Sequence, residues 1–173
     1  MKPRIKIIYS NYYPSLSKEM LQQSRKILKS LGIEYDEIGV PGSFEIPHEI
    51  SRSLKEDTLE NQNDISKYKK EEKKKIRDNI VQLAKLSQLN LSSKCIYSGY
   101  LTLGCIIKGT TINHEAISVS IFTNLQRLSI ENIVPIGNGI FNANNLKEAK
   151  KKASDCAIQA CKVLYRLIDE KKK

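Results

Sequence analysis

The stretch Cys95-Ile96-Tyr97-Ser98-Gly99-Tyr100-Leu101-Thr102-Leu103 is a nearly continuous apolar run, and it leads directly into Gly104-Cys105-Ile106-Ile107-Lys108-Gly109-Thr110-Thr111-Ile112-Asn113-His114-Glu115. An uninterrupted apolar run is typical of a strand that is buried on both faces of a sheet. Apolar residues then recur at helical spacing, at Ile117, Ile121, Leu125 and Leu128. The stretch therefore predicts a strand, a glycine-bounded turn and a helix.

The turn between this strand and helix has two interpretations. Backbone N–H groups at a helix start are unpaired and lie at the positive end of the helix dipole, so they attract anions. The hydroxyl groups of Thr110 and Thr111 could complete a phosphate site there. The alternative is an ordinary turn in which Thr111 caps the helix and binds nothing.

The remaining chain repeats the strand–helix rhythm. Apolar runs predict strands over 5–9, 34–40 and 133–141. A first helix is expected between the first two, capped by Ser15 or Ser17 and ended by Gly32. Another helix should begin near Glu45, since proline at position 47 is tolerated only in a first helical turn. The apolar face of the first helix is expected to include Leu16, Met20, Ile27 and Leu31.

The final helix is expected to be capped by residues 142–145 and to lie close to a sheet through a small apolar face, formed by Ala153, Ala157, Ala160 and Leu164. Strands that alternate with helices imply parallel pairing and right-handed crossovers. The predicted fold is therefore α/β, a doubly wound parallel sheet flanked by helices. Such sheets bind ligands at the carboxyl ends of their strands. Four loops are expected there: 10–14, 41–45, 104–111 and 137–141.

Composition narrows the classes of function. The 173 residues fit one domain, with a polar, lysine-rich insertion at about 56–93 that is either solvated surface or a partner-binding element. Much of the net charge of +10 lies in residues 67–75 of that insertion and in residues 171–173 of the C-terminal tail. Tyr68 is the one aromatic among these lysines, too few for a stacking platform, which argues against nucleic-acid binding. No apolar run is long enough to cross a bilayer, so no membrane role is expected. The four cysteines and two histidines form no metal-ligand pattern, and we expect reduced thiols and a cytoplasmic protein.

Three motifs resemble lumazine synthases, the penultimate enzymes of riboflavin biosynthesis. They are Pro41-Gly42-Ser43-Phe44-Glu45-Ile46-Pro47, Leu103-Gly104-Cys105-Ile106-Ile107-Lys108-Gly109-Thr110-Thr111 and Pro135-Ile136-Gly137-Asn138-Gly139-Ile140. The resemblance covers nearly the whole chain outside the insertion. It implies a single domain over residues 1–173, with a flavodoxin-like three-layer sandwich fold. It also implies a homopentamer or a larger shell of pentamers, with active sites between subunits and no cofactor or metal.

The resemblance assigns substrate-binding roles to particular residues. Tyr12 matches the aromatic that stacks on the pyrimidine, although a surface tyrosine is the plain alternative. Ser43, Phe44 and Glu45 match the segment that holds the ribityl chain, where a carboxylate suits vicinal hydroxyls. Glu45 could equally be an acid favoured at a helix start. Ile107 and Asn138 match pocket positions, and Thr110 and Thr111 match the phosphate-binding turn.

Two positions depart from the family pattern. The acid–base histidine falls on Asn113, and His114 stands one residue later, about 100° around a regular helix. Asparagine cannot exchange protons near neutral pH, so His114 is a catalytic candidate only if the loop–helix junction aims it into the site. The phosphate-binding arginine position holds Lys152, which keeps the charge without bidentate geometry. A glycine-containing joint near the C-terminus is missing, which would let the last two helices fuse.

The resemblance implies that 5-amino-6-ribitylamino-uracil condenses with 3,4-dihydroxy-2-butanone 4-phosphate to give 6,7-dimethyl-8-ribityllumazine, phosphate and water. Holding two reactants together supplies much of such catalysis, so a chain without the family histidine could be slow but active. The alternative is a diverged shell-forming or ligand-binding homologue with little or no activity. Turnover of both substrates by the purified protein separates the two.

Overall fold

The computed structural model describes residues 3–56 and 96–170, and the chain divides into two compact units. One unit comprises Met1–Ser51 and Tyr97–Lys173 and contains the sheet, while the other comprises Arg52–Ile96. The ordered elements are β1 (Arg4–Ser10), α1 (Pro14–Ser30), β2 (Glu34–Val40), a short 3₁₀ helix η1 (Ser43–Glu45), β3 (Gly99–Ile107), α4 (Asn113–Glu131), β4 (Ile136–Ala143) and α5 (Leu146–Glu170). Helical residues 46–51 follow η1 within the sheet-containing unit.

The four strands form one parallel sheet in the order β2-β1-β3-β4. Ser10 is paired with Val40, and Tyr9 is paired with Leu103, so β1, β2 and β3 point their carboxyl ends to the same edge. Strands β3 and β4 continue together beyond that edge, as far as the pair Ile107 and Ala143. The α/β fold with a parallel sheet predicted from the alternating pattern is confirmed, and it is consistent with the flavodoxin-like arrangement of lumazine synthases.

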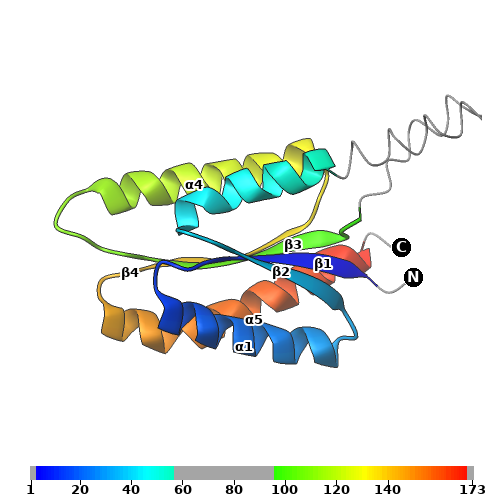
Figure 1. Cartoon of the computed structure of the whole chain (residues 1–173), viewed down its shortest axis with the longest axis horizontal. Helices are drawn as coiled ribbons and strands as arrows, with labels where there is room; N and C mark the ends of the chain where they lie inside the picture. The colour runs from blue at the N-terminus through cyan, green and yellow to red at the C-terminus, as the bar shows by residue number, and fades with distance from the viewer. Residues whose placement is uncertain (1–2, 57–95, 171–173) are drawn as a thin grey trace, which may run out of the picture. The chain divides into compact units, whose positions relative to one another are not determined.

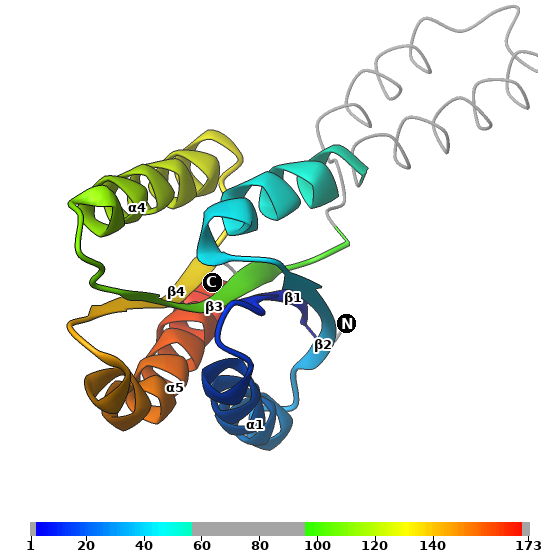
Figure 2. The same cartoon turned by 60° about the vertical axis from the view of Figure 1, so that its left-hand side comes forward.

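Helices cover both faces of the sheet (Figures 1 and 2). Helices α1 and α5 lie on one face, and α4 lies on the other together with residues 46–51. Ile5 and Ile7 of β1 and Leu101 and Leu103 of β3 are fully or almost fully buried on the α1–α5 side, as the period-two alternation of a strand requires. The intervening residues of β1, including Lys6 and Ile8, face the other layer.

The first helix begins differently from the prediction. Pro14 occupies the first helical position, where its fixed backbone angle and missing N–H are tolerated, and Tyr13 precedes it without a side-chain cap. The hydroxyl of Ser17 instead donates to the carbonyl oxygens of Ser10 and Tyr13. The predicted serine cap is therefore wrong. The predicted end is right, because Gly32 has a φ of +66°, a left-handed conformation that favours glycine.

The central strand is displaced along the sequence relative to the prediction. It runs over Gly99–Ile107, so Gly104 lies inside β3 and not in the turn after it. A methyl group on Gly104 would lie 2.5 Å from the Ser43 hydroxyl oxygen, so this glycine makes room for η1 to approach the strand. The turn is consequently shorter than predicted. Helix α4 starts at Asn113 after Ile112, and neither threonine caps it.

The last helix is a single element of 25 residues. Its start is capped as predicted, since the side-chain oxygen of Asn145 accepts a hydrogen bond from the Glu148 N–H at 2.9 Å. The predicted small face is buried, with Ala153, Ala157 and Leu164 at 0% exposure. The expected fusion of the last two helices is observed.

The predicted insertion at 56–93 lies almost entirely outside the described residues. Within 3–56 and 96–170, no helix combines the length and the apolar character that a membrane crossing needs.

Candidate active site

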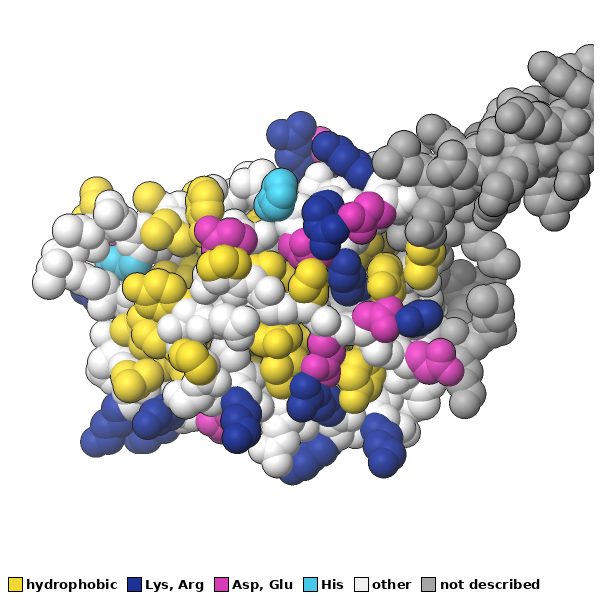
Figure 3. Space-filling model, in the orientation of Figure 1, with side chains coloured by type: hydrophobic (Ala, Val, Ile, Leu, Met, Phe, Trp, Pro, Cys, Tyr) yellow, Lys and Arg dark blue, Asp and Glu magenta, His cyan; other side chains and the backbone are white. Residues whose placement is uncertain are grey.

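A cavity of about 490 Å³ opens at the carboxyl ends of β1, β2 and β3. Three loops surround it: the one after β1, the one that leads into η1 and the one between β3 and α4. Seen in the orientation of Figure 1, hydrophobic side chains gather at this end of the sheet-containing unit (Figure 3). The predicted site residues that line the cavity are Tyr12, Ser43, Phe44, Glu45, Ile107, Thr111, Asn113 and His114.

The aromatic side of the cavity comes from the loop after β1. Tyr12 is 69% exposed, and its ring packs edge-on against Tyr13 with a centroid separation of 4.9 Å. Desolvation by burial raises the pKa of the Tyr13 hydroxyl, with a smaller contribution from Tyr12. Tyr13 therefore buttresses an exposed ring that could stack on a planar ligand.

The turn 41–45 contributes polar atoms. Ser43 is buried at 7% exposure, and its hydroxyl oxygen has no hydrogen-bond partner among the described residues. Buried polar atoms are nearly always satisfied, and this hydroxyl is itself buried against Gly104 of β3, which leaves it without a partner in the ligand-free chain. The Glu45 carboxylate lies close to Gly42. A methyl group added at Gly42 would lie 2.9 Å from Glu45 Oε2.

The start of α4 brings both Asn113 and His114 to the cavity. The His114 side chain is only 14% exposed, and Nδ1 lies 2.9 Å from the carbonyl oxygen of Thr111. A carbonyl oxygen can only accept a hydrogen bond, so Nδ1 is the donor in this contact. Nε2 lies 3.8 Å from the Glu115 carboxylate. The histidine is thus neither fully solvent-facing nor shifted away from the site.

Comparison with known proteins identifies the family. The model of the family described as 6,7-dimethyl-8-ribityllumazine synthase matches residues 2–65 and 78–172. The chain belongs to the 6,7-dimethyl-8-ribityllumazine synthase family.

Curated relatives carry the same name. The chain is 27% identical to the Bartonella bacilliformis lumazine synthase over 153 residues, which are 88% of this chain and 77% of the relative. It is 31% identical to that of Buchnera aphidicola subsp. Baizongia pistaciae over 88% of this chain and 74% of the relative. For Agrobacterium fabrum the identity is 25%, over 99% of this chain and 97% of the relative.

Asn138 and Lys152, which were also predicted for the lumazine synthase site, do not line this cavity. Asn138 lies within β4, not in a loop, so the predicted fourth loop at 137–141 is wrong. The Asn138 side-chain oxygen accepts a hydrogen bond from the Ile140 N–H at 3.0 Å, and the residue lines a separate cavity of about 280 Å³ beside α4. Thr110 is exposed on the turn next to the cavity and is not part of its wall.

Lys152 lies on α5 and is held by a carboxylate of its own helix. Its Nζ donates to Glu148 at 2.5 Å, one helical turn away, and this hydrogen bond raises the pKa of Lys152. The Glu148 pKa falls to about 2, first through Lys152 and then through hydrogen bonds from Asn144. The lysine is therefore charged but already paired within its own chain.

Seven cavity residues were missed by the prediction: Tyr13, Pro41, Gly42, Cys105, Ile106, Gly109 and Ile117. Ile117 could have been found from helical spacing, because it lies one turn after Asn113. Cys105 could have been found from the strand alternation, because it lies two residues before Ile107. Placing the end of the strand at Leu103 hid Cys105, whereas Ile117 was assigned only to the apolar face of the helix.

The Cys105 thiol should be unreactive in the folded protein. Burial raises its pKa to about 12, with smaller contributions from Cys156 and Glu148. Since the thiolate is the nucleophile, its fraction at pH 8 falls roughly 10³-fold relative to a thiol of ordinary pKa. We expect iodoacetamide to leave Cys105 unmodified in native protein and to modify it in urea, as measured by peptide mass spectrometry. Equal modification in both conditions would contradict this.

Proposed function

We propose that the protein catalyses the condensation of 5-amino-6-ribitylamino-uracil with 3,4-dihydroxy-2-butanone 4-phosphate to 6,7-dimethyl-8-ribityllumazine, with release of phosphate and water. Family membership supports the reaction. The observation that carries the placement of the site is the cavity at the strand ends, where Ser43, a carboxylate, an exposed aromatic ring and a histidine converge. A polyhydroxylated, planar substrate matches that combination.

In the proposed complex, Tyr12 stacks on the pyrimidine ring, and Phe44 covers it from the opposite loop. The hydroxyl of Ser43 and the carboxylate of Glu45 pair with the ribityl hydroxyls. The walls at Ile107 and Ile117 exclude water, which strengthens these hydrogen bonds. The amine of the pyrimidine then attacks the ketone of the second substrate, and loss of water gives an imine.

The phosphate end of the site is proposed at the turn 109–114. The hydroxyls of Thr110 and Thr111 and the N–H groups at the start of α4 face the phosphate, which suits the positive end of the helix dipole. His114 Nε2 takes the proton whose removal accompanies phosphate loss and returns a proton during ring closure. Asn113 orients the phosphate group by hydrogen bonding.

A turnover assay tests the reaction. Purified protein is incubated with both substrates, and the lumazine product is followed by its absorbance and mass. Product formation that depends on both substrates supports the proposal. An intact assembly that binds the pyrimidine and forms no product would instead favour a diverged binding protein.

We also propose that the working form is a pentamer or a multiple of pentamers, with Asn138 and Lys152 completing the site of a neighbouring copy. Both residues belong to the predicted site, and neither reaches the cavity of its own chain. Helix α4 exposes apolar residues that a neighbouring copy would cover, among them Val119 and Ile130. Free thiols at Cys105, Cys156 and Cys161 suit a cytoplasmic setting.

Disruption of the α4 face should dissociate the assembly. We expect Val119→Asp to reduce the sedimentation mass from five or more chains to a smaller species, because an unpaired carboxylate would be buried between copies. The matched control is Val163→Asp on α5, which is 50% exposed and should leave a five-chain mass. A monomeric wild-type protein, or unchanged mass in Val119→Asp, would contradict the proposed interface.

A further inference from the structure

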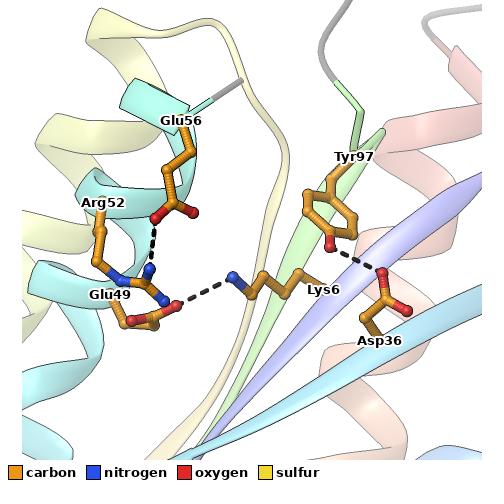
Figure 4. A network of polar contacts seen from close by, with 6 residues as sticks. All are labelled: Lys6, Asp36, Glu49, Arg52, Glu56 and Tyr97. Atoms are coloured by element: carbon orange, nitrogen blue, oxygen red, sulfur yellow. Dashed lines mark hydrogen bonds and ion pairs between the residues drawn. The ribbon is translucent and has the colours of Figure 1, made fainter. Parts of the chain in front are cut away.

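A buried ion pair joins β1 to the helical residues that follow the cavity turn. Lys6 Nζ donates to Glu49 Oε1 at 3.0 Å, and the two residues are only 9% and 6% exposed (Figure 4). Lysine and glutamate are almost never buried this deeply unless they are paired. The pair lies on the sheet face opposite α1 and α5, among fully buried Ile8, Ile46 and Ile50.

The Lys6 end of this pair is tied to the other strands. Its ammonium group lies 5.7 Å from the centroid of the Tyr97 ring, close enough for a cation–π contact. The Tyr97 hydroxyl donates to Asp36 of β2 at 2.7 Å, and Arg4 of β1 donates to the same carboxyl group at 2.8 Å. The Lys6 ammonium group is therefore held in place relative to β2 and to the segment that leads into β3.

The Glu49 end fixes the segment that forms the cavity turn. Glu49 lies one helical turn after Glu45, and η1 leads directly into the helical residues. Ile46 and Ile50 bury this segment against the sheet, but apolar burial is not directional. A charge-assisted hydrogen bond is directional, so it selects one rotation and one longitudinal position of the helical segment.

Net stability is a poor explanation for such a pair, because replacing a buried ion pair by apolar side chains of similar volume is often neutral or stabilising. We propose that Lys6 and Glu49 are positioning residues, which hold the turn 43–45 in the orientation that binds the ribityl-bearing pyrimidine. This rests on the proposed function. The two residues touch no part of the cavity and act through Ser43 and Glu45.

The test compares ligand affinities in a doubly apolar variant. Lys6→Met/Glu49→Met removes both charges of the pair at once. The matched control is Arg25→Met/Glu37→Met, which removes a second ion pair between two elements, α1 and β2, away from the cavity. Calorimetry measures the Kd of 5-amino-6-ribitylamino-uracil and, separately, that of inorganic phosphate. Thermal unfolding is measured on the same samples.

We expect the doubly apolar variant to bind the pyrimidine roughly three- to tenfold more weakly, with phosphate affinity and unfolding midpoint close to wild type. The control variant should bind both ligands as wild type does. An unchanged pyrimidine Kd overturns the inference, and so does a parallel fall in both affinities and in the unfolding midpoint, which would indicate general loss of packing. If wild type binds the pyrimidine without turnover, only the proposed reaction fails, and the Kd comparison still decides the inference. A wild-type chain that does not bind the pyrimidine overturns both proposals.

Discussion

His114→Ala is expected to lower kcat for lumazine formation by about 10²-fold while KM changes by less than about threefold. The physical reason is that His114 supplies the only imidazole on the cavity wall in the described chain, with Nδ1 held by the Thr111 carbonyl and Nε2 left to exchange a proton. Removing a proton-transfer group affects the transition state more than substrate binding. Steady-state kinetics with both substrates measures the two parameters.

The second histidine of the chain provides the control. His48 lines a different cavity, between residues 44–51 and α4, so His48→Ala should leave kcat unchanged. A further variant separates position from chemistry: Asn113→His places an imidazole at the family position, and we expect it to recover part of the rate lost in His114→Ala. An unchanged kcat in His114→Ala would refute the catalytic role and leave proximity as the main source of catalysis.

Gly137→Ala is expected to destabilise the fold by about 3 kcal/mol, which for a chain of this size lowers Tm by roughly 6–12 °C. A methyl group at Gly137 would lie 2.6 Å from the carbonyl oxygen of Ala160 and 2.8 Å from Cβ of Leu164. Both belong to α5, whose small face lies directly against β4. Because the clash involves helix backbone, it cannot be relieved by rotating one side chain, and α5 must move.

Gly109→Ala is the matched control for stability. Nothing lies within 4 Å of a methyl group at Gly109, and its φ is not in the left-handed region. Thermal unfolding followed by circular dichroism should show a Tm within about 2 °C of wild type for this variant, as is usual for surface substitutions. A Gly137→Ala protein with the same Tm as the control would show that α5 can withdraw from β4 at little cost.

The order of strands and helices was predictable because apolar periodicity reports burial directly. Strand β2 was predicted with its observed bounds, and Ala153, Ala157 and Ala160 of the buried face of α5 were predicted. The end of β3 was not predictable, because Gly104 resembles a turn residue in sequence. Glycine is needed at position 104 because Ser43 approaches β3 there, a contact between segments far apart in the chain.

The candidate site was predictable to a similar extent. Three of the four predicted loops meet at one cavity, since the carboxyl ends of parallel strands share an edge. What a linear pattern could not supply was the rotation of α4 at its first turn, which decides that Asn113 and His114 both reach the wall. Nor could it supply the Lys6–Glu49 pair, because a lysine in a strand normally indicates a solvent-facing position.

The parallel order of the sheet has a consequence for folding kinetics. Ile5 of β1 is paired with Tyr35 on one side and with Gly99 on the other, so the two neighbours of β1 are reached at very different distances along the chain. The sequence separation between β1 and β3 is much longer than the separation between β1 and β2. This separation delays the docking of β3, because non-local strand pairing is slow. The chain should therefore form β1–α1–β2 first and complete the sheet, and with it the cavity, in a later step.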